Sequence, residues 1–120
     1  MSEPAKILVV EDDETVRKVL KKILEEKGYL VDMAETGEKA IEKAEVKVYN
    51  LALIDIRLPD MEGTKLLPTM QKTNPKMAKI MITGYPTMRS AIEAVNKGAN
   101  GYILKPIKIE NLLKIVKENL

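Results

Sequence analysis

The chain contains no cysteine, histidine, tryptophan or phenylalanine among its 120 residues. Without cysteine it can form no disulfide framework and perform no thiolate chemistry, and this composition fits a reducing compartment. Without histidine it lacks the side chain that most often acts as a base near neutral pH and most often binds a metal ion. Any bound metal should therefore be a hard cation with oxygen ligands.

Long apolar runs and a large net charge are missing as well. The first apolar run, Ile7–Val10, is too short for a signal peptide or a membrane span. A net charge of +2 does not indicate nucleic-acid binding, and the lysines near the C-terminus alternate with acids and lack aromatic stacking partners. We therefore expect a cytoplasmic protein with no direct nucleic-acid or membrane partner, folded as a single domain over residues 1–120.

What the sequence does contain is a regular alternation of short apolar runs and amphipathic segments. Strands are predicted at 7–10, 29–34, 51–55, 79–83 and 101–104. Apolar residues at helical spacing follow each strand, within 16–24, 40–44, 66–70, 91–95 and 109–116. Such an alternation favours an α/β fold, a parallel sheet with helices on both faces, doubly wound in the strand order 2-1-3-4-5.

Two features of the helical segments carry specific expectations. Thr36 and Thr87 precede apolar-periodic segments and are predicted to cap the helices that follow. Pro68 lies within the third helical segment and is tolerated there only in the first turn, where a missing N–H costs little.

Polar side chains stand where four of the predicted strands end. Glu11 and Asp12 follow the first strand, Asp55 ends the third, Thr83 ends the fourth, and Lys105 follows the fifth. In the expected strand order these ends meet at one edge of the sheet, beside the point where the winding reverses. Clustered carboxylates call for a compensating cation, and oxygen ligands suit Mg²⁺. With an ammonium and a hydroxyl opposite, the chemistry indicated is phosphoryl transfer onto Asp55.

At these residues the sequence resembles the receiver domain of two-component response regulators, from about Lys6 to Leu120. The matching motifs are ILVVEDD at 7–13, LALIDIRLPDMEG at 51–63, IMITG at 80–84 and KGANGYILKP at 97–106. The family has a flavodoxin-like (βα)5 fold. The segment 83–106 is also similar to receivers of nitrogen-regulation-type transcription activators. Whether the chain is a stand-alone regulator or a fragment of a longer protein stays open.

The resemblance implies a phosphoacceptor switch rather than an enzyme. Asp55 would accept the phosphoryl group of a sensor histidine kinase or a phosphotransfer protein. Asp12, Asp55 and the backbone carbonyl of Arg57 would bind Mg²⁺, with Mn²⁺ as an alternative, and Glu11 would act through a water molecule. Asp13, the second aspartate of the motif, is assigned to the N-cap of the following helix.

The resemblance also implies how the signal leaves the site. Thr83 and Lys105 would stabilise the phosphoryl group, and the bond between Lys105 and Pro106 would be cis. Thr83 and Tyr102 would switch together and remodel the face of the fourth helix, fifth strand and fifth helix. That face would contact an output domain or downstream protein, or form a phosphorylation-dependent homodimer.

Large side chains occupy the positions two residues beyond Asp55 and two residues beyond Thr83. Arg57 and Tyr85 occupy these positions, where the family tunes autodephosphorylation. Two bulky side chains there would obstruct the attacking water, so we expect slow autodephosphorylation and a long-lived phosphorylated state.

Other interpretations of Asp55 stay in view. Taken singly, it could be a solvated turn residue. A phosphatase of the haloacid-dehalogenase-like type would carry a second acid two residues on, where this chain has Arg57. A flavin or nucleotide carrier would carry a phosphate-binding loop after the first strand, where the acidic segment 11–15 would repel phosphate. A receiver-like module that is never phosphorylated would not need the complete set of rim residues.

Overall fold

The structure, a computed structural model, describes residues 3–84 and 87–120, and its elements follow the alternation that the sequence predicts. In chain order they are β1 (Lys6–Val10), α1 (Glu14–Glu26), β2 (Leu30–Ala34), α2 (Gly37–Val46), β3 (Leu51–Asp55), a 3-10 turn (Gly63–Lys65), α3 (Leu66–Thr73), β4 (Ala78–Thr83), α4 (Met88–Asn96), β5 (Gly101–Leu104) and α5 (Ile109–Glu118). The strand bounds differ from the predicted ones by at most one residue.

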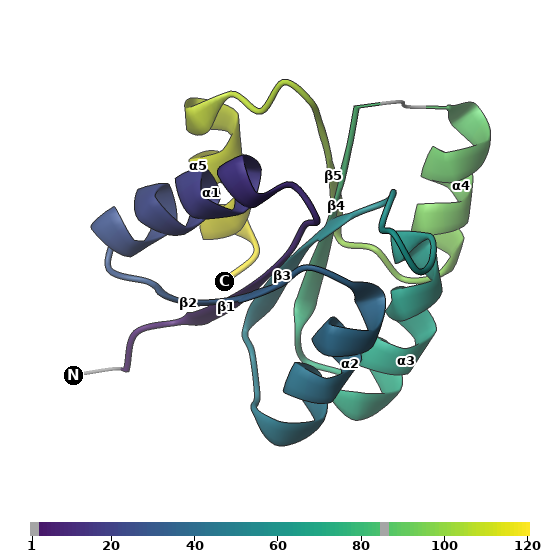
Figure 1. Cartoon of the computed structure of the whole chain (residues 1–120), viewed down its shortest axis with the longest axis horizontal. Helices are drawn as coiled ribbons and strands as arrows, with labels where there is room; N and C mark the ends of the chain where they lie inside the picture. Colours follow the sequence, from purple (N-terminus) through teal and green to yellow (C-terminus); the bar gives the residue numbers. More distant parts are fainter. Residues whose placement is uncertain (1–2, 85–86) are drawn as a thin grey trace.

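The five strands form one parallel sheet in the order β2-β1-β3-β4-β5, which confirms the predicted fold class. Figure 1 shows α1 and α5 on one side of the sheet and α2, α3 and α4 on the other. The winding reverses between β1 and β3, whose registers pair Val10 with Ile54. The carboxyl ends of these two strands therefore lie next to each other.

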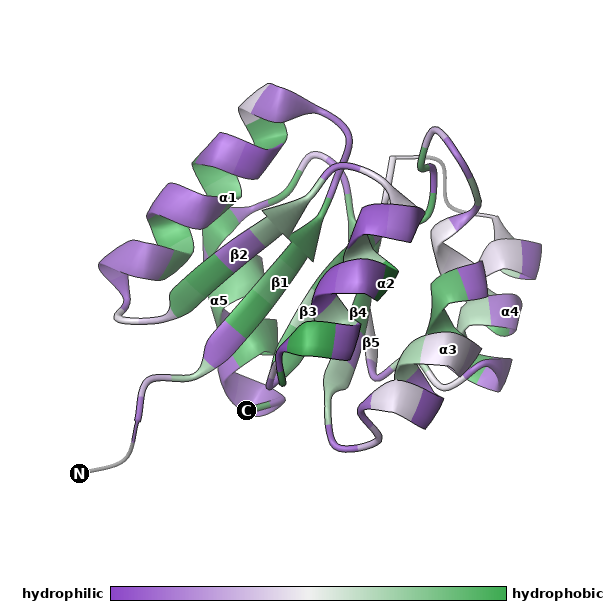
Figure 2. Cartoon of the chain, turned by 60° about the horizontal axis from the view of Figure 1, so that its bottom comes forward, coloured by the Kyte–Doolittle hydropathy of each residue, from purple (hydrophilic) through white to green (hydrophobic). Residues whose placement is uncertain are grey.

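Each face of the sheet has its own apolar core. In β1, Ile7 and Val9 pack with α1 and α5, whereas Leu8 and Val10 pack on the opposite face. All residues of β3 are buried, because helices cover this central strand from both sides. Figure 2 shows the corresponding pattern: the strands are mainly hydrophobic, and hydrophilic residues alternate with hydrophobic ones along α1.

Side-chain caps stand at the start of α1, α2 and α4. Asp13 accepts from Val16 N at 3.0 Å, Thr36 accepts from Lys39 N at 3.1 Å, and Thr87 forms a capping box at the start of α4, as predicted. Pro68 is the third residue of α3, so it lies in the first turn, where the sequence allowed it. Within 3–84 and 87–120, none of the helices is long and apolar enough to cross a membrane.

Candidate functional site

The carboxyl edge of the sheet brings together the polar side chains that the sequence assigned to a site. Glu11 follows β1, Asp55 ends β3 and Thr83 ends β4, and their exposed fractions are only 2, 5 and 1%. Lys105 follows β5, and its backbone N–H donates to Thr83 O at 2.8 Å. We call these four residues the acceptor rim. Their convergence follows from strand order, because residues at the ends of neighbouring parallel strands must lie side by side.

Lys105 bridges the two buried carboxylates of the acceptor rim. Its Nζ donates to Glu11 Oε1 at 2.6 Å and to Asp55 Oδ2 at 2.9 Å. The backbone N–H of Arg57 donates to the other oxygen, Asp55 Oδ1, at 2.9 Å. Both oxygens of Asp55 are therefore held by hydrogen bonds from two directions, which fixes the orientation of the carboxylate.

Three carboxylates of this region could hold a metal ion. Ligand oxygens of Glu11, Asp12 and Asp55 lie within 4.8 Å of one another. Glu11 Oε2 is buried and has no hydrogen-bond partner among the described residues. A buried oxygen without a partner is costly, and in this protein either a proton shared with Asp55 or a hard divalent cation with its bound water would satisfy it. The donor set, which consists of oxygen atoms alone, fits Mg²⁺.

The two buried carboxyl groups differ in their affinity for a proton. Burial, and then the hydrogen bond to Asp55, raise the pKa of Glu11 from 4.5 to about 8, although Lys105 opposes the shift. Burial alone would also raise the pKa of Asp55, but hydrogen bonds from Glu11, the Arg57 amide and Lys105 outweigh it and lower that pKa. In the metal-free protein the pair thus keeps the charge on Asp55.

A tight loop after β3 packs against the backbone of Asp55. Gly63 N donates to Ile56 O at 2.6 Å, and Leu58 N donates to Met61 O at 3.2 Å. A side chain at Gly63 would overlap the carbonyl oxygen of Asp55, so the close approach requires glycine. Arg57 lies in this loop, and its assignment as a carbonyl ligand stays a prediction.

Of the two residues assigned to the switch, Thr83 belongs to the acceptor rim, and Tyr102 lies on β5 in contact with α4. The ring of the half-buried Tyr102 packs against the core of the α2–α4 face, and its hydroxyl is 3.1 Å from Ser90 Oγ of α4. The bond between Lys105 and Pro106 is cis, the form that the resemblance implies. Tyr85 lies outside the described residues.

The structure adds contacts that the sequence did not indicate. Arg17 Nη1 donates to the backbone carbonyls of Glu11 and Asp12, both at 2.8 Å. Thr64, beside the acceptor loop, donates to Glu93 Oε1 of α4 at 3.3 Å. These residues were missed because only their side-chain directions connect them to the site.

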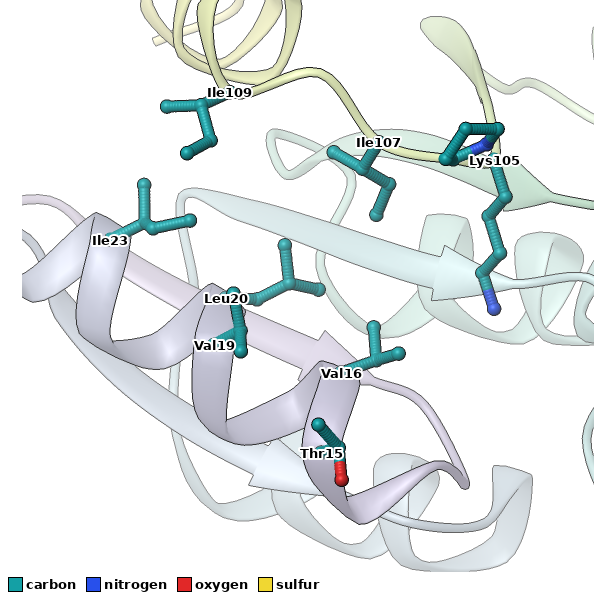
Figure 3. Close-up of a pocket in the computed structure, with 9 residues that line it drawn as sticks. Thr15, Val16, Val19, Leu20, Ile23, Lys105, Ile107 and Ile109 are labelled. Atoms are coloured by element: carbon teal, nitrogen blue, oxygen red, sulfur yellow. The ribbon is translucent and has the colours of Figure 1, made fainter.

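An apolar groove adjoins Lys105 between α1 and the segment that leads into α5. Its volume is about 350 Å³, and Figure 3 shows Ile107 and Ile109 facing Val16, Val19 and Ile23 of α1. Lys105 stands at one end of the groove in the same view. The groove therefore joins an apolar surface to the acceptor rim.

Comparisons with known proteins agree with this geometry. A family model described as the response regulator receiver domain matches residues 7–117. The transcriptional regulatory protein ZraR of Klebsiella oxytoca is 36% identical over 98% of this chain. The match spans only 27% of ZraR, so the chain covers about a quarter of that relative's length.

Two solved structures extend the comparison. A CheY-like response regulator receiver domain protein from Methanospirillum hungatei JF-1 superposes with a TM-score of 0.93, at 44% identity over 96% of this chain and 92% of the other. A response regulator from Burkholderia pseudomallei, solved with a phosphorylated aspartic acid, a calcium ion and citrate, gives a TM-score of 0.90 at 28% identity, over 96% of this chain and 68% of the other.

Proposed function

The chain belongs to the response regulator receiver domain family, and from this premise we propose that Asp55 accepts a phosphoryl group from a sensor histidine kinase or phosphotransfer protein in the presence of Mg²⁺. One observation carries the proposal: Asp55, Glu11 and Lys105 converge at the reversal point of the sheet, and the buried Oε2 of an ionised Glu11 has no hydrogen-bond donor among the described residues. The phosphorylated aspartic acid and calcium ion of the Burkholderia relative support the same assignment.

In the proposed site Asp12, Asp55 and the Arg57 carbonyl would hold Mg²⁺, with Glu11 acting through water and Mn²⁺ as an alternative. The ion would offset negative charge during transfer. The phosphorus–nitrogen bond of the donor phosphohistidine breaks as an Asp55 oxygen forms a bond to phosphorus. The Lys105 ammonium, already beside Asp55 Oδ2, can then bind a phosphoryl oxygen, and the Thr83 hydroxyl binds another.

The deciding experiment is incubation with acetyl phosphate and Mg²⁺, followed by intact mass measurement. We expect one phosphoryl adduct that is lost in Asp55→Asn and lost on chelation of the metal. Asp12→Asn should weaken labelling strongly, whereas Asp13→Asn should not, because asparagine caps a helix as well as aspartate does. An unmodified wild-type chain would favour the receiver-like module that is never phosphorylated.

Labelling on another residue, or turnover of a phosphate ester without a stable adduct, would favour a phosphatase of the haloacid-dehalogenase-like type. That interpretation has little support in the loop after β3. Position 57, where such an enzyme would carry its second acid, holds an arginine. The segment after β1 also gives little support to a flavin or nucleotide carrier, because the carboxylates of Glu11 and Asp12 lie where the phosphate-binding loop of such a protein would be.

The phosphoryl group should change the surface through Thr83 and Tyr102. An acyl phosphate places about two negative charges beside Thr83 and Lys105. Tyr102 is tied to Ser90, so movement of the tyrosine must alter a contact of α4. The α4–β5–α5 face exposes the apolar residues Met88, Ile92, Val95, Leu104 and Ile109. We propose this face as the contact with an output domain or downstream protein, or with a second copy in a phosphorylation-dependent homodimer.

The apolar groove beside Lys105 is the proposed contact for the phosphodonor protein. It is an apolar surface that adjoins Lys105 of the rim, so a donor bound there can present its phosphohistidine to Asp55. Val19→Ser, at a half-exposed position of the groove, should slow transfer from the kinase and leave labelling by acetyl phosphate unchanged. Equal loss with both donors would contradict this assignment.

Arg57 and Tyr85 are proposed to slow autodephosphorylation. The Arg57 amide donates to Asp55 Oδ1 at 2.9 Å, and this contact supports a role for Arg57 beside the phosphorylated side chain. Alanine at both positions should shorten the lifetime of phospho-Asp55, measured by the decay of the adduct in mass spectra. Decay of the wild-type adduct within seconds, with no acceleration in the double variant, would contradict the proposal.

A further inference from the structure

Arg17 is a cation that the proposed chemistry does not use, although it contacts the acidic loop directly. Its side chain, on the first turn of α1, is only 13% exposed. Nη1 donates to Glu11 O and to Asp12 O, both at 2.8 Å, and Nη2 lies 3.7 Å from Glu35 Oε2 after β2. The guanidinium is thus directed at the backbone of the loop and at an outlying acid.

Two consecutive carbonyls that converge on one nitrogen require a bent chain. In an extended strand, successive residues face opposite sides, so both oxygens could not reach the same donor. The chain bends at Asp12, directly after Glu11 N has continued the sheet by donating to Ala34 O at 3.0 Å. The bend decides where the two side chains leave the backbone.

We propose that Arg17 is a positioning residue that holds this bend, so that the carboxylates of Glu11 and Asp12 face the same point as Asp55. This inference rests on the proposed function, because it assigns Arg17 to the metal site of the phosphoacceptor. The bond lengths fit the role: both are short charge-assisted hydrogen bonds, and a planar guanidinium holds its acceptors in fixed directions. Outer contacts of this kind typically change metal affinity 10–100-fold when removed.

The direction in which divalent cation affinity changes when Arg17 is replaced distinguishes a positioning role from a simple effect of its charge. If Arg17 acted only as a nearby positive charge, its removal would make the acidic cluster more negative and tighten divalent cation binding. If it positions the ligands, its removal loosens the bend and weakens binding in spite of that charge change. A purely structural role would lower stability but leave the affinity of the folded protein unchanged.

The experiment measures the Kd of the full chain for Mg²⁺ by calorimetric titration. The Kd for Mn²⁺ is measured separately by electron paramagnetic resonance. The test variant is Arg17→Met, which keeps the length of the side chain and removes the donors and the charge. The control is Lys18→Met, which removes one charge from the neighbouring position of α1, where the side chain is 69% exposed. We expect a Kd about tenfold higher for Arg17→Met. For the control we expect a value close to that of the wild type.

Arg17→Lys is the second variant, and it decides the matter should the methionine variant fail to fold. It keeps the charge and loses the planar fork, so we expect weaker binding here too, by roughly threefold to fivefold. Thermal unfolding in a chelator and the stoichiometry of the titration establish how much protein is folded. Unchanged or tighter Mg²⁺ binding in folded Arg17→Met or Arg17→Lys would overturn the inference.

Labelling at high metal concentration separates this inference from the proposed function. All the metal ligands remain in Arg17→Met, so saturating Mg²⁺ should restore labelling by acetyl phosphate. Persistent loss at saturation would show that Arg17 does more than position the ligands and would overturn the inference alone. A wild-type chain that binds Mg²⁺ but is never labelled would overturn the proposed function alone, and one that binds no divalent cation would overturn both.

Discussion

The acceptor rim and helix α4 are built in opposite ways. The rim combines three buried polar residues at the ends of central strands with the partly exposed Lys105, which follows the edge strand β5 and joins Glu11 and Asp55 by short hydrogen bonds. In α4 only Ala94 is buried, and the apolar side chains of Met88, Ile92 and Val95 face outward. Hydrogen bonds hold the first region together, whereas the second keeps most of its side chains outside the core.

This difference matches the division of labour in a switch. Chemistry requires preorganised groups, because each misplaced group raises the barrier. A response element must lie close in free energy to a second arrangement, since a ligand can shift only a nearly balanced equilibrium. The polar contacts of α4 with Thr64 and Tyr102 suit that requirement, because they can be exchanged at small cost.

Substitution of Gly63 should disturb the position of Asp55 and with it the acceptor rim. In Gly63→Ala the methyl group would meet the Asp55 carbonyl and lie 2.9 Å from Ile54 Cγ2, so the acceptor strand or its loop must shift. We expect about 3 kcal/mol of destabilisation in chemical denaturation, the upper end of overpacking costs, together with loss of labelling at Asp55.

Gly84→Ala is the matched control for that substitution. An added methyl there lies 3.7 Å from Lys105 Cβ, which is ordinary van der Waals contact. Its free energy of unfolding should stay within about 1 kcal/mol of the wild type. Similar losses in both variants would mean that the close packing under Asp55 is not what makes the rim rigid.

The rim should also make the metal-free protein sensitive to pH. The pKa of Glu11 is about 8 in the fold against 4.5 ordinarily, so the fold binds the proton more tightly than the unfolded chain. The resulting stability is fully present below pH 4.5 and is lost as pH rises through 8. The pKa of Asp55 is lowered, so its contribution is already present above its ordinary value of 3.8 and stays constant in this window.

Thermal unfolding between pH 5 and 8 in a chelator tests this expectation. The wild type should lose at least about 1.4 kcal/mol, the equivalent of one pKa unit. Glu11→Gln, which stays neutral, should show a flatter profile. Mg²⁺ should stabilise the wild type more at pH 8 than at pH 6, because binding requires the deprotonated ligand. A wild-type profile that is flat without metal would contradict the assignment.

The same contrast explains what the sequence could predict. The strands and their order were predictable because the central apolar runs are buried on both faces and all five runs alternate with amphipathic segments. The rim residues were predictable because chain position at the end of a strand determines their location. Asp55, Thr83 and Lys105 needed no knowledge of side-chain direction to be placed together.

The contacts around α4 and α2 could not be predicted in this way. Thr64 and Glu93 are 29 positions apart, and Asp60 caps α2 by accepting from Gly37 N and Glu38 N from a loop 22 residues or more away. Such pairs depend on how a loop turns and on which rotamer is chosen. Arg17 is near the acidic loop in sequence, but only the bend at Asp12 turns two carbonyls toward it.

Thr64→Val tests the comparison by removing one hydrogen bond between the 3-10 turn Gly63–Lys65 and α4. Thr64 is buried and its hydroxyl bonds Glu93, which keeps a second partner in Lys97 at 2.8 Å. The loss should therefore be that of one hydrogen bond, about 1 kcal/mol, without an orphaned charge. Amide hydrogens of α4 should exchange about fivefold faster, while those of β3 should be unchanged.

Thr73→Val is the control for this substitution, because the Thr73 hydroxyl bonds Thr69 O within its own helix α3. It should leave exchange in α4 unaffected. Equal acceleration in α4 and β3 in the Thr64 variant would mean that the two regions unfold as one unit.

The smallest effect on stability is expected at the outer surface of α4. Val95 is 70% exposed, and serine has a helix propensity similar to that of valine, so Val95→Ser should change the free energy of unfolding by less than about 0.5 kcal/mol. If the α4–β5–α5 face forms the proposed homodimer, the same change should weaken self-association of the phosphorylated protein in sedimentation equilibrium. Val46→Ser is the matched control, since Val46 is 83% exposed but ends α2, away from that face. Equal weakening in both variants would show that exposed apolar area in general, rather than α4, drives association, and the division between a rigid acceptor and a responsive helix would lose its functional meaning.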